Sequence, residues 1–239
     1  MLKNNARILL MFLSSIVIVG LISSCNKTIE PDLSDFGYEY FPIEIGQYRT
    51  YYSMRIDYNL DGSIDTTQYL TKEIVEDTVV YSDGSKRYLL GRYSANIGSD
   101  NWQKDSLWTA MVSESNVVIS EGNIDFIKLA FPVKSALKWD GNARNNRTEE
   151  LYEISDLEAP YSYDTLSFSN TLTVIQADLI DPAKLTEDDY RIEVYAKGVG
   201  LVHKLKMRIN YCDPTKCSEN GTIEDGEVFE QKLIEFGEE

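Results

Sequence analysis

The chain has few of the residues on which protein chemistry often depends. Its 239 residues include one histidine, three cysteines and six prolines, and 23 lysines and arginines stand against 39 acids. A single histidine argues against a histidine-rich metal centre. No serine-containing nucleophile motif accompanies it, so nothing supports Ser-His-Asp catalysis. The net charge of −16 argues against nucleic acid as a partner, because an acidic surface repels phosphate backbones.

Long apolar runs are equally scarce. One uncharged, mostly apolar stretch runs from Ile8 to Leu21, after Lys3 and Arg7. As a helix it would span about 21 Å at roughly 1.5 Å per residue, which is short for a bilayer core of about 30 Å. A basic start, a short apolar region and small residues at a cleavage point are the parts of a secretory signal. An uncleaved membrane anchor is one alternative, and an ordinary secretory signal followed by a coincidental cysteine is another.

The most specific signal closes this stretch. The sequence LISSC, residues 21–25, resembles the lipobox of bacterial lipoproteins, with an aliphatic residue three positions before the cysteine. The resemblance implies removal of a signal peptide, residues 1–24, and lipidation of Cys25 with diacylglycerol and a further acyl chain such as palmitate. Several acyl chains anchor a protein firmly in a membrane. We therefore expect a protein of the cell outer membrane, on either the periplasmic or the outward face.

The rest of the chain divides into two parts. Residues 25–40 are predicted to be the lipidated N-terminus and a flexible tether, since Pro31 and four acidic residues argue against regular structure there. Residues 41–239 suit one β domain in size. Loss of Lys3 and Arg7 with the signal leaves 21 basic against 39 acidic residues, a net charge of −18.

Period-2 alternation is the strongest structural signal. From residue 47 to residue 58, apolar and aromatic side chains at even positions alternate with mostly polar ones at odd positions, and 199–211 repeats the pattern. We expect the even face of 47–58 to be buried. Lys204, Lys206 and Arg208 share the polar face of the second strand, and we expect them to meet carboxylates on neighbouring strands.

Nine further strand candidates follow the same rules and are separated by Asp-Gly, Asn-Gly and Asp-Pro turns. Short turns favour antiparallel neighbours, and so many strands are too many for one flat sheet. The sequence therefore predicts an all-β fold, an antiparallel meander of about eleven strands forming a strongly curved sheet or half-barrel. The nine candidates are 64–81, 85–94, 105–113, 116–120, 124–131, 148–155, 170–180, 189–197 and 227–236.

Three short motifs stand at the starts of predicted strands: YFPIEIGQY, FPVKSALKW and GVGLV. Together they resemble a family of Bacteroidota cell-envelope lipoproteins of uncertain function, in which Trp often replaces Tyr48. The resemblance implies an envelope location and, more loosely, the half-barrel architecture of lipoprotein carriers. The motifs carry no catalytic chemistry, and we expect Gly198 and Gly200 to form a turn or bulge between two strands.

One segment resembles a calcium loop. Asp57, Asn59, Asp61 and Asp65 fall at positions 1, 3, 5 and 9 of the calcium-loop pattern, which places several oxygen ligands around one ion. Gln68 stands at position 12 in place of the bidentate glutamate, and the predicted flanks are strands. A polar hairpin turn is therefore the alternative to a calcium site.

The remaining candidates are few. With Cys25 lipidated, Cys212 and Cys217 are expected to form a disulfide in an oxidising compartment. Tyr161 and Tyr163, in the predicted loop EAPYSYD, are candidates for an exposed ligand-binding platform, with ordinary packing as the alternative. His203 lies on the apolar side of its strand, which is typical of a buried, hydrogen-bonded histidine.

These observations favour a non-catalytic, membrane-anchored envelope lipoprotein rather than an enzyme. Its expected role is to bind an apolar or glycan ligand, or to act as a scaffold at the outer membrane. A surface glycan-binding module of a polysaccharide-uptake system is one alternative, and a hydrolase is another. No cofactor is expected apart from calcium at the loop described above.

Overall fold

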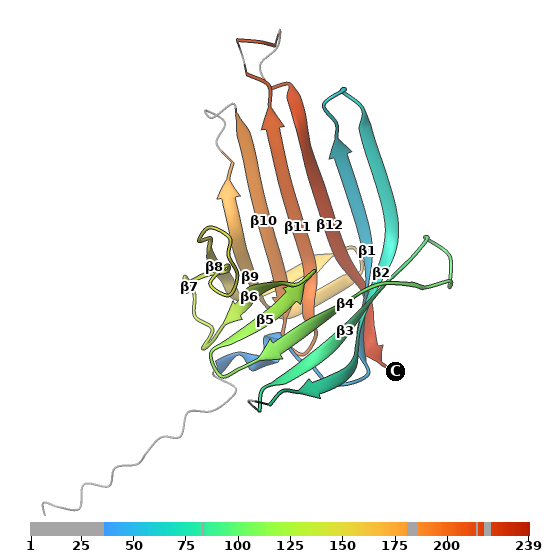
Figure 1. Cartoon of the computed structure of the whole chain (residues 1–239), viewed down its shortest axis with the longest axis vertical. Coiled ribbons are helices and arrows are strands. Elements are labelled where there is room, and N and C mark those ends of the chain that lie inside the picture. The colour runs from blue at the N-terminus through green and yellow to red at the C-terminus, as the bar shows by residue number, and fades with distance from the viewer. Residues whose placement is uncertain (1–35, 83, 181–185, 214, 218–220) are drawn as a thin grey trace, which may run out of the picture. The chain divides into compact units, whose positions relative to one another are not determined.

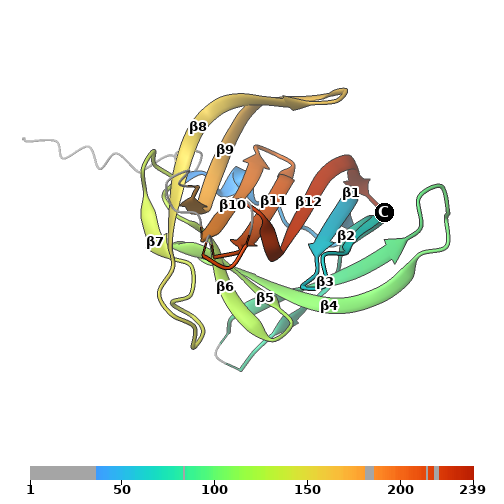
Figure 2. The same cartoon turned by 90° about the horizontal axis from the view of Figure 1, so that it is seen from above.

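The computed structural model describes residues 36–239 except 83, 181–185, 214 and 218–220. In this part of the chain twelve strands form one antiparallel sheet (Figures 1 and 2), which confirms the predicted all-β fold with one strand more than expected. The strands are β1 (Gln47–Tyr58), β2 (Ile64–Val80), β3 (Lys86–Ala95), β4 (Gln103–Val112), β5 (Asn116–Glu121), β6 (Ile124–Ala130), β7 (Lys138–Asp140), β8 (Leu151–Tyr163), β9 (Leu166–Leu179), β10 (Glu187–Ala196), β11 (Gly200–Tyr211) and β12 (Ile223–Glu238).

The strands follow one another around a nearly closed barrel. Their order is β6-β5-β4-β3-β2-β1-β12-β11-β10-β9-β8-β7, so β1 and β12 pair at the centre of the sheet. The two edges, β6 and β7, also approach each other. The backbone N–H of Ile127 donates to the carbonyl oxygen of Gly141 at 2.9 Å, and the indole N–H of Trp139 donates to the carbonyl of Ile127 at 2.9 Å. These bonds satisfy part of the open edge that a curved sheet would otherwise expose.

Two clusters of apolar side chains hold the barrel together. The larger lies among strands on both sides of the interior and includes Leu90, Leu129, Ile154 and Tyr195. The smaller contains Val202 and other buried residues of β1, β10 and β12, and side chains of β8 and β9 pack against it. The β8–β9 hairpin arches over β10–β12 on the side away from β3–β6 (Figure 2), which explains this second cluster.

The folded domain begins before residue 41, where the sequence predicted that the tether ends. A short 3-10 turn, η2 (Tyr38–Tyr40), packs on the barrel, and Tyr40 is fully buried. The ring of Tyr38 meets Phe131 edge-on at 4.7 Å. Aromatic side chains therefore draw residues 36–40 into the core in spite of their acidic neighbours. Residues 1–35, with the predicted signal, Cys25 and the rest of the tether, lie outside the described residues.

The motifs at the strand starts have structural roles. Arg49 at the start of β1 donates from Nε to the carbonyl of Val199 at 2.5 Å and from Nη2 to the carbonyl of Pro42 at 2.8 Å. Arg49 thereby connects the motif YFPIEIGQY, which contains Pro42, to the motif GVGLV, which contains Val199. Gly198 and Gly200 form the expected turn between β10 and β11, both with positive φ. A Cβ on Gly200 would lie 2.8 Å from the guanidinium of Arg49, so that position also needs the close approach that glycine permits.

In the first half of β1 the buried side chains lie mainly on the face opposite to the predicted one, although Thr50 on the predicted face is also buried and Arg55 on the other face is exposed. Arg49, Tyr51 and Ser53 at odd positions are buried, whereas Tyr52 and Met54 on the expected face are partly exposed. The reason is that polar side chains inside the barrel find partners. Ser53, for example, lies 3.0 Å from the hydroxyl of Thr71 and accepts a hydrogen bond from Gln231. Buried polar groups are tolerated when they are hydrogen-bonded. The polar side chains at the odd positions of β1 therefore did not identify the solvent-facing side of the strand.

Candidate functional site

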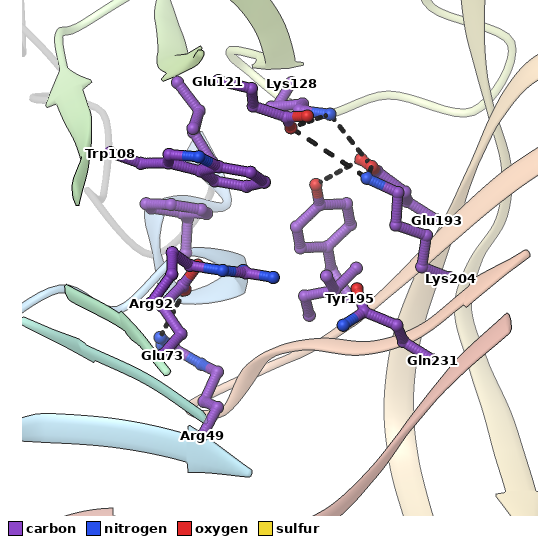
Figure 3. A pocket seen from close by; sticks show the side chains of 13 residues that line it. Arg49, Glu73, Arg92, Trp108, Glu121, Lys128, Glu193, Tyr195, Lys204 and Gln231 are labelled. Atoms are coloured by element: carbon purple, nitrogen blue, oxygen red, sulfur yellow. Dashed lines mark hydrogen bonds and ion pairs between the residues drawn. The ribbon is translucent and has the colours of Figure 1, made fainter. Parts of the chain in front are cut away.

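The interior of the barrel holds a buried charged cluster, which Figure 3 shows from close by. Lys128 on β6 places its ammonium nitrogen 2.7 Å from Glu121 and 3.0 Å from Glu193. Lys204 on β11 lies 3.1 Å from the same Glu193, and Tyr195 donates its hydroxyl to that carboxylate at 2.7 Å. The cluster therefore connects β5 and β6 to β10 and β11 across the interior.

Its members stay charged because each has a partner. Burial alone would raise the pKa of Glu193, but Lys128 and Lys204 outweigh burial and hold it well below its usual range. Burial alone would lower the pKa of Lys128, but Glu121 and Glu193 outweigh it and the pKa is raised. The pKa of Glu121 is lowered in the same way by the two lysines, against the effect of burial. Paired buried charges of this kind fix the relative position of the elements that carry them.

A second polar group lies on the opposite wall, from β1 to β4. Glu73 accepts a hydrogen bond from Arg92 at 2.8 Å, and the guanidinium of Arg92 lies 4.2 Å from the ring centroid of Trp108. Between the two walls remains a space of about 30 Å³. This is room for water-sized molecules and too little for an acyl chain or a sugar. The closed interior is therefore structural.

A much larger open groove begins where this interior ends. It measures about 510 Å³ and runs between β6 and β11, with the β7–β8 loop along its rim. Six basic and three acidic residues line it, together with Phe126, Tyr152, Gln176 and other side chains. We call it the basic groove. Its charged lining residues are Lys128, Arg147, Arg191, Lys204, Lys206, Arg208, Glu121, Glu149 and Glu150.

Ion pairs hold most of these cations in place. Arg191 bonds to Asp189 at 2.7 Å and to Glu150, and Arg208 lies 3.3 Å from Asp189. Lys206 pairs with Glu227. The expectation that the three cations of β11 meet carboxylates across neighbouring strands is confirmed. Burial alone would lower the pKa of Arg191, but the bonds to Glu150 and Asp189 raise it.

Gln176 differs from these ion-paired lining residues because its side-chain amide nitrogen lacks a partner in the described part of the chain. Its side chain is 9% exposed, and its amide nitrogen has no hydrogen-bond partner among the described residues. Most buried donors in folded proteins are paired, so an unpaired one needs an explanation. Asn142, which also lines the groove, shows the ordinary case, since its amide donates to the carbonyl of Thr148 at 2.7 Å.

The structure places Tyr161 and Tyr163 away from this groove, and they form no exposed platform. The predicted loop around them belongs to β8, which extends to Tyr163 instead of ending at residue 155. Both rings are partly buried against the second apolar cluster. Tyr163 donates to the carbonyls of Val202 and Leu233, and the hydroxyl of Tyr161 lies 2.6 Å from His203 Nδ1. The two tyrosines therefore pack the hairpin against the barrel, which was the alternative to a ligand-binding platform.

His203 is buried, as its apolar neighbours predicted. Its other ring nitrogen, Nε2, lies 3.0 Å from Glu230, which in turn lies 2.8 Å from Lys232. Burial lowers the pKa of His203, and the effect of Glu230 opposes this only in part. A neutral histidine between a tyrosine and a glutamate fastens the β8–β9 hairpin to β11 and β12.

The calcium-like residues hold the turn between β1 and β2. Asp61 accepts hydrogen bonds from the backbone and hydroxyl of Ser63 at 2.9 and 2.6 Å, and Asn59 donates to Asp65 at 2.9 Å. Asp57 pairs with Arg55 at 2.9 Å. Among the residues described by the structure, no group of three or more His, Cys, Asp or Glu side chains is arranged to hold a metal ion.

The two remaining cysteines lie between β11 and β12. Cys212 and Cys217 are joined by a disulfide, as their spacing predicted, and close a short loop at one end of the sheet. The third, Cys25, lies outside the described residues. No helix in the described part of the chain is both long and apolar enough to cross a bilayer.

The interior cluster could be predicted in part from the sequence, and the groove could not. Lys128 and Glu193 each stand inside an apolar run, in IDFIKLA and YRIEVYA, where a charged residue is unusual. Their pairing depends on the curvature that brings β6 opposite β10. Gln176 has no such signal, because its environment depends on a local irregularity of β9.

No protein-family model and no curated protein matches the chain. Among solved structures, the chain is similar to a protein of Bacteroides fragilis NCTC 9343 that has a YmcC-like fold. The two are 14% identical, the TM-score is 0.42, and the alignment covers 83% of this chain and 98% of that one.

Proposed function

We propose that the protein is an exported lipoprotein, held in the outer membrane by lipid on Cys25, which binds a glycan in the basic groove. The lipobox-like residues 21–25 and the preceding apolar stretch support export and anchoring. The bond between Cys212 and Cys217 fits an oxidising compartment outside the cytoplasm.

The proposed binding role rests on the buried, unpaired amide of Gln176 in an open groove of about 510 Å³. Pockets for small ligands commonly measure about 300–1,000 Å³ and contain a few polar groups that orient the ligand. A ligand oxygen would supply the acceptor that Gln176 lacks. Charged and amide side chains dominate the lining, which favours a hydroxyl-rich ligand over an apolar one.

The paired carboxylates where the groove meets the interior favour binding over hydrolysis. A glycosidase needs one carboxyl that is protonated at its working pH and can donate to the leaving oxygen. Glu121 and Glu193 share Lys128 and Lys204, which lower the pKa of both against the effect of burial. Two ionised carboxylates fixed in ion pairs do not supply that acid.

Anchoring is tested by Cys25→Ser in the full chain expressed in a bacterium that lipidates exported proteins. We expect the wild type to incorporate labelled palmitate and to sediment with outer membranes. The variant should incorporate no label and should leave the membrane fraction. Unchanged labelling of the variant would contradict lipidation at Cys25, and retention in the membrane without labelling would indicate an uncleaved N-terminal anchor.

Binding is tested with the lipoprotein in detergent on an array of bacterial and plant glycans. Thr148→Trp places a bulky ring at the rim of the groove and should abolish binding. Asn146→Trp is the matched control, because Asn146 is exposed in the same loop but does not line the groove. Equal binding by both variants would place the glycan elsewhere, and a wild type that binds no glycan would overturn the proposed role.

A further inference from the structure

Gln176 is buried on the same face of β9 as Leu172 and Val174, and it lies at a β-bulge. Ala177 pairs with Arg191 and Ile175 pairs with Ile192 on β10, so Gln176 has no residue opposite it. Bulges of this kind turn a side chain in a new direction and are frequent beside binding sites. Here the bulge gives the groove a buried amide donor that no other described residue satisfies.

The groove is basic on a strongly acidic protein. Six cationic side chains line it against three acidic ones, while the whole chain has a net charge of −16. Two of the cations remain accessible, since the side chains of Lys206 and Arg208 are 33% and 46% exposed. Arg147 on the rim is exposed as well, and its guanidinium lies 5.4 Å from the ring centroid of Phe126. A ligand would therefore meet three accessible cations, together with the exposed carboxylate of Glu149.

The amount of positive charge is limited. Asp189, Glu193 and Glu227 do not line the groove, yet each forms an ion pair with at least one of its cations. These carboxylates reduce the field that a ligand meets, because opposite charges a few ångströms apart largely cancel at a distance. Six carboxylates thus stand against the six cations, and because the groove has no large excess of positive charge, it suits a singly charged group better than a dianionic phosphate.

We propose that the groove recognises an acidic sugar, in which a carboxylate faces the cations and a ligand oxygen accepts from the amide of Gln176. The planar guanidinium of Arg208 matches a carboxylate in geometry. Arg191 is already held by Asp189 and Glu150, so its position costs little further ordering when the ligand binds. This inference rests on the proposed glycan binding and specifies its chemical class.

The test measures binding of three oligosaccharides to the full-length lipoprotein in detergent by titration calorimetry. The probes are an oligogalacturonate, its fully methyl-esterified form and a sulfated galactan fragment. We expect the oligogalacturonate to bind at least tenfold more tightly than the ester, which keeps the sugar but removes the charge. Its affinity should fall as salt increases, because the groove and ligand charges are screened.

Two variants test whether Arg208 and Gln176 contribute to ligand binding. Arg208→Gln should weaken oligogalacturonate binding about tenfold, the usual effect of losing a charge-assisted hydrogen bond, and should leave the weak binding of the ester unchanged. Arg55→Gln is the control, since its side chain is 47% exposed, is also paired with acids and does not line the groove. Gln176→Leu should lose binding without loss of Tm, because it removes an unpaired buried donor.

The outcomes separate this inference from the proposed function. Equal affinity for the acid and the ester would overturn the acidic-sugar class and leave glycan binding intact. Tighter binding of the sulfated fragment would overturn the carboxylate in favour of another anion. A lower Tm for Gln176→Leu with full binding would assign the amide a purely structural role. Binding of none of the three, with no hit on the array, would overturn both proposals.

Discussion

The ammonium of Lys128 lies 3.0 Å from the carboxylate of Glu193, and the pair joins β6 to β10 across the interior of the barrel. Both side chains are almost completely buried. Neither charge could remain there alone, because an isolated buried ion loses its hydration without compensation. The pair thus makes the closed shape of the sheet depend on two residues that lie far apart in the sequence.

Replacement of Lys128 by Met should therefore be strongly destabilising. We expect a loss of about 3–5 kcal/mol in the free energy of unfolding, the usual effect of breaking a buried ion pair, because Glu121 and Glu193 both lose a cation and Lys204 alone remains close to Glu193. Urea denaturation followed by tryptophan fluorescence measures this. The double variant Lys128→Met with Glu193→Leu should recover part of the loss, and a single variant within 1 kcal/mol of the wild type would contradict a structural role for the pair.

The β8–β9 hairpin should loosen in mild acid. The pKa of His203 is lowered chiefly by burial, so the folded state disfavours its charged form. Its contribution to stability is complete above the unfolded pKa of about 6.5 and is lost as pH falls through the lower folded pKa. Hydrogen exchange of residues 161–168, corrected for the intrinsic rate, should accelerate below about pH 6.

His203→Gln serves as the control for that experiment, because glutamine does not titrate. Its hairpin should exchange faster than the wild type at neutral pH and should show no further step in acid. Tyr161→Phe keeps the ring but loses the bond to His203 Nδ1. At neutral pH its hairpin should exchange at a rate between those of the wild type and His203→Gln. A pH step that persists in His203→Gln would assign the titration to another group.

The β1–β2 turn should be weakened by Asp61→Ala even without metal. The substitution removes the acceptor for the backbone and hydroxyl of Ser63, so the turn loses two hydrogen bonds and the Tm should fall slightly. Thermal unfolding in EDTA measures the loss. A rise in Tm on adding calcium that occurs in the wild type and is absent in Asp61→Ala would instead establish the turn as a calcium site.

Loss of the disulfide should lower stability modestly. Cys212 and Cys217 close a loop of only a few residues, and the chain-entropy relation gives about 2 kcal/mol for a loop of that length. Denaturant unfolding of Cys212→Ser with Cys217→Ser should show this difference with an unchanged slope. Addition of a reductant should lower the stability of the wild type to that of the variant and leave the variant unchanged.

The strands could be predicted from the sequence because turn residues separate them and their side chains alternate. The missed strand, β7, has only three residues, and such a length carries no periodic signal. The continuation of β8 was missed because Asp156, Glu158 and Pro160 are residues typical of loops, and in the structure the two acids do have positive φ. A bulged strand can accommodate these features, whereas a sequence pattern reads them as a loop.

The groove could not be predicted for a different reason. Lys204, Lys206 and Arg208 were recognised as one face of a strand, but the face opposite them depends on how far the sheet curves. Gln176 became a candidate only when pairing around Arg191 and Ile192 showed the bulge. Register irregularities of one residue are decided by the whole sheet, and a single strand does not encode them.

The pairing of β1 with β12 has a consequence for how the chain folds. Gln47 pairs with Glu238, so the central seam of the sheet joins the first strand to the last. Contacts between residues so distant in sequence form slowly, because the loop between them must be closed first. A chain in transit through a narrow secretion channel would therefore lack its central partner until β12 emerged. This strand order delays completion of the sheet until the last strand is available, which agrees with the proposal that the chain is exported unfolded.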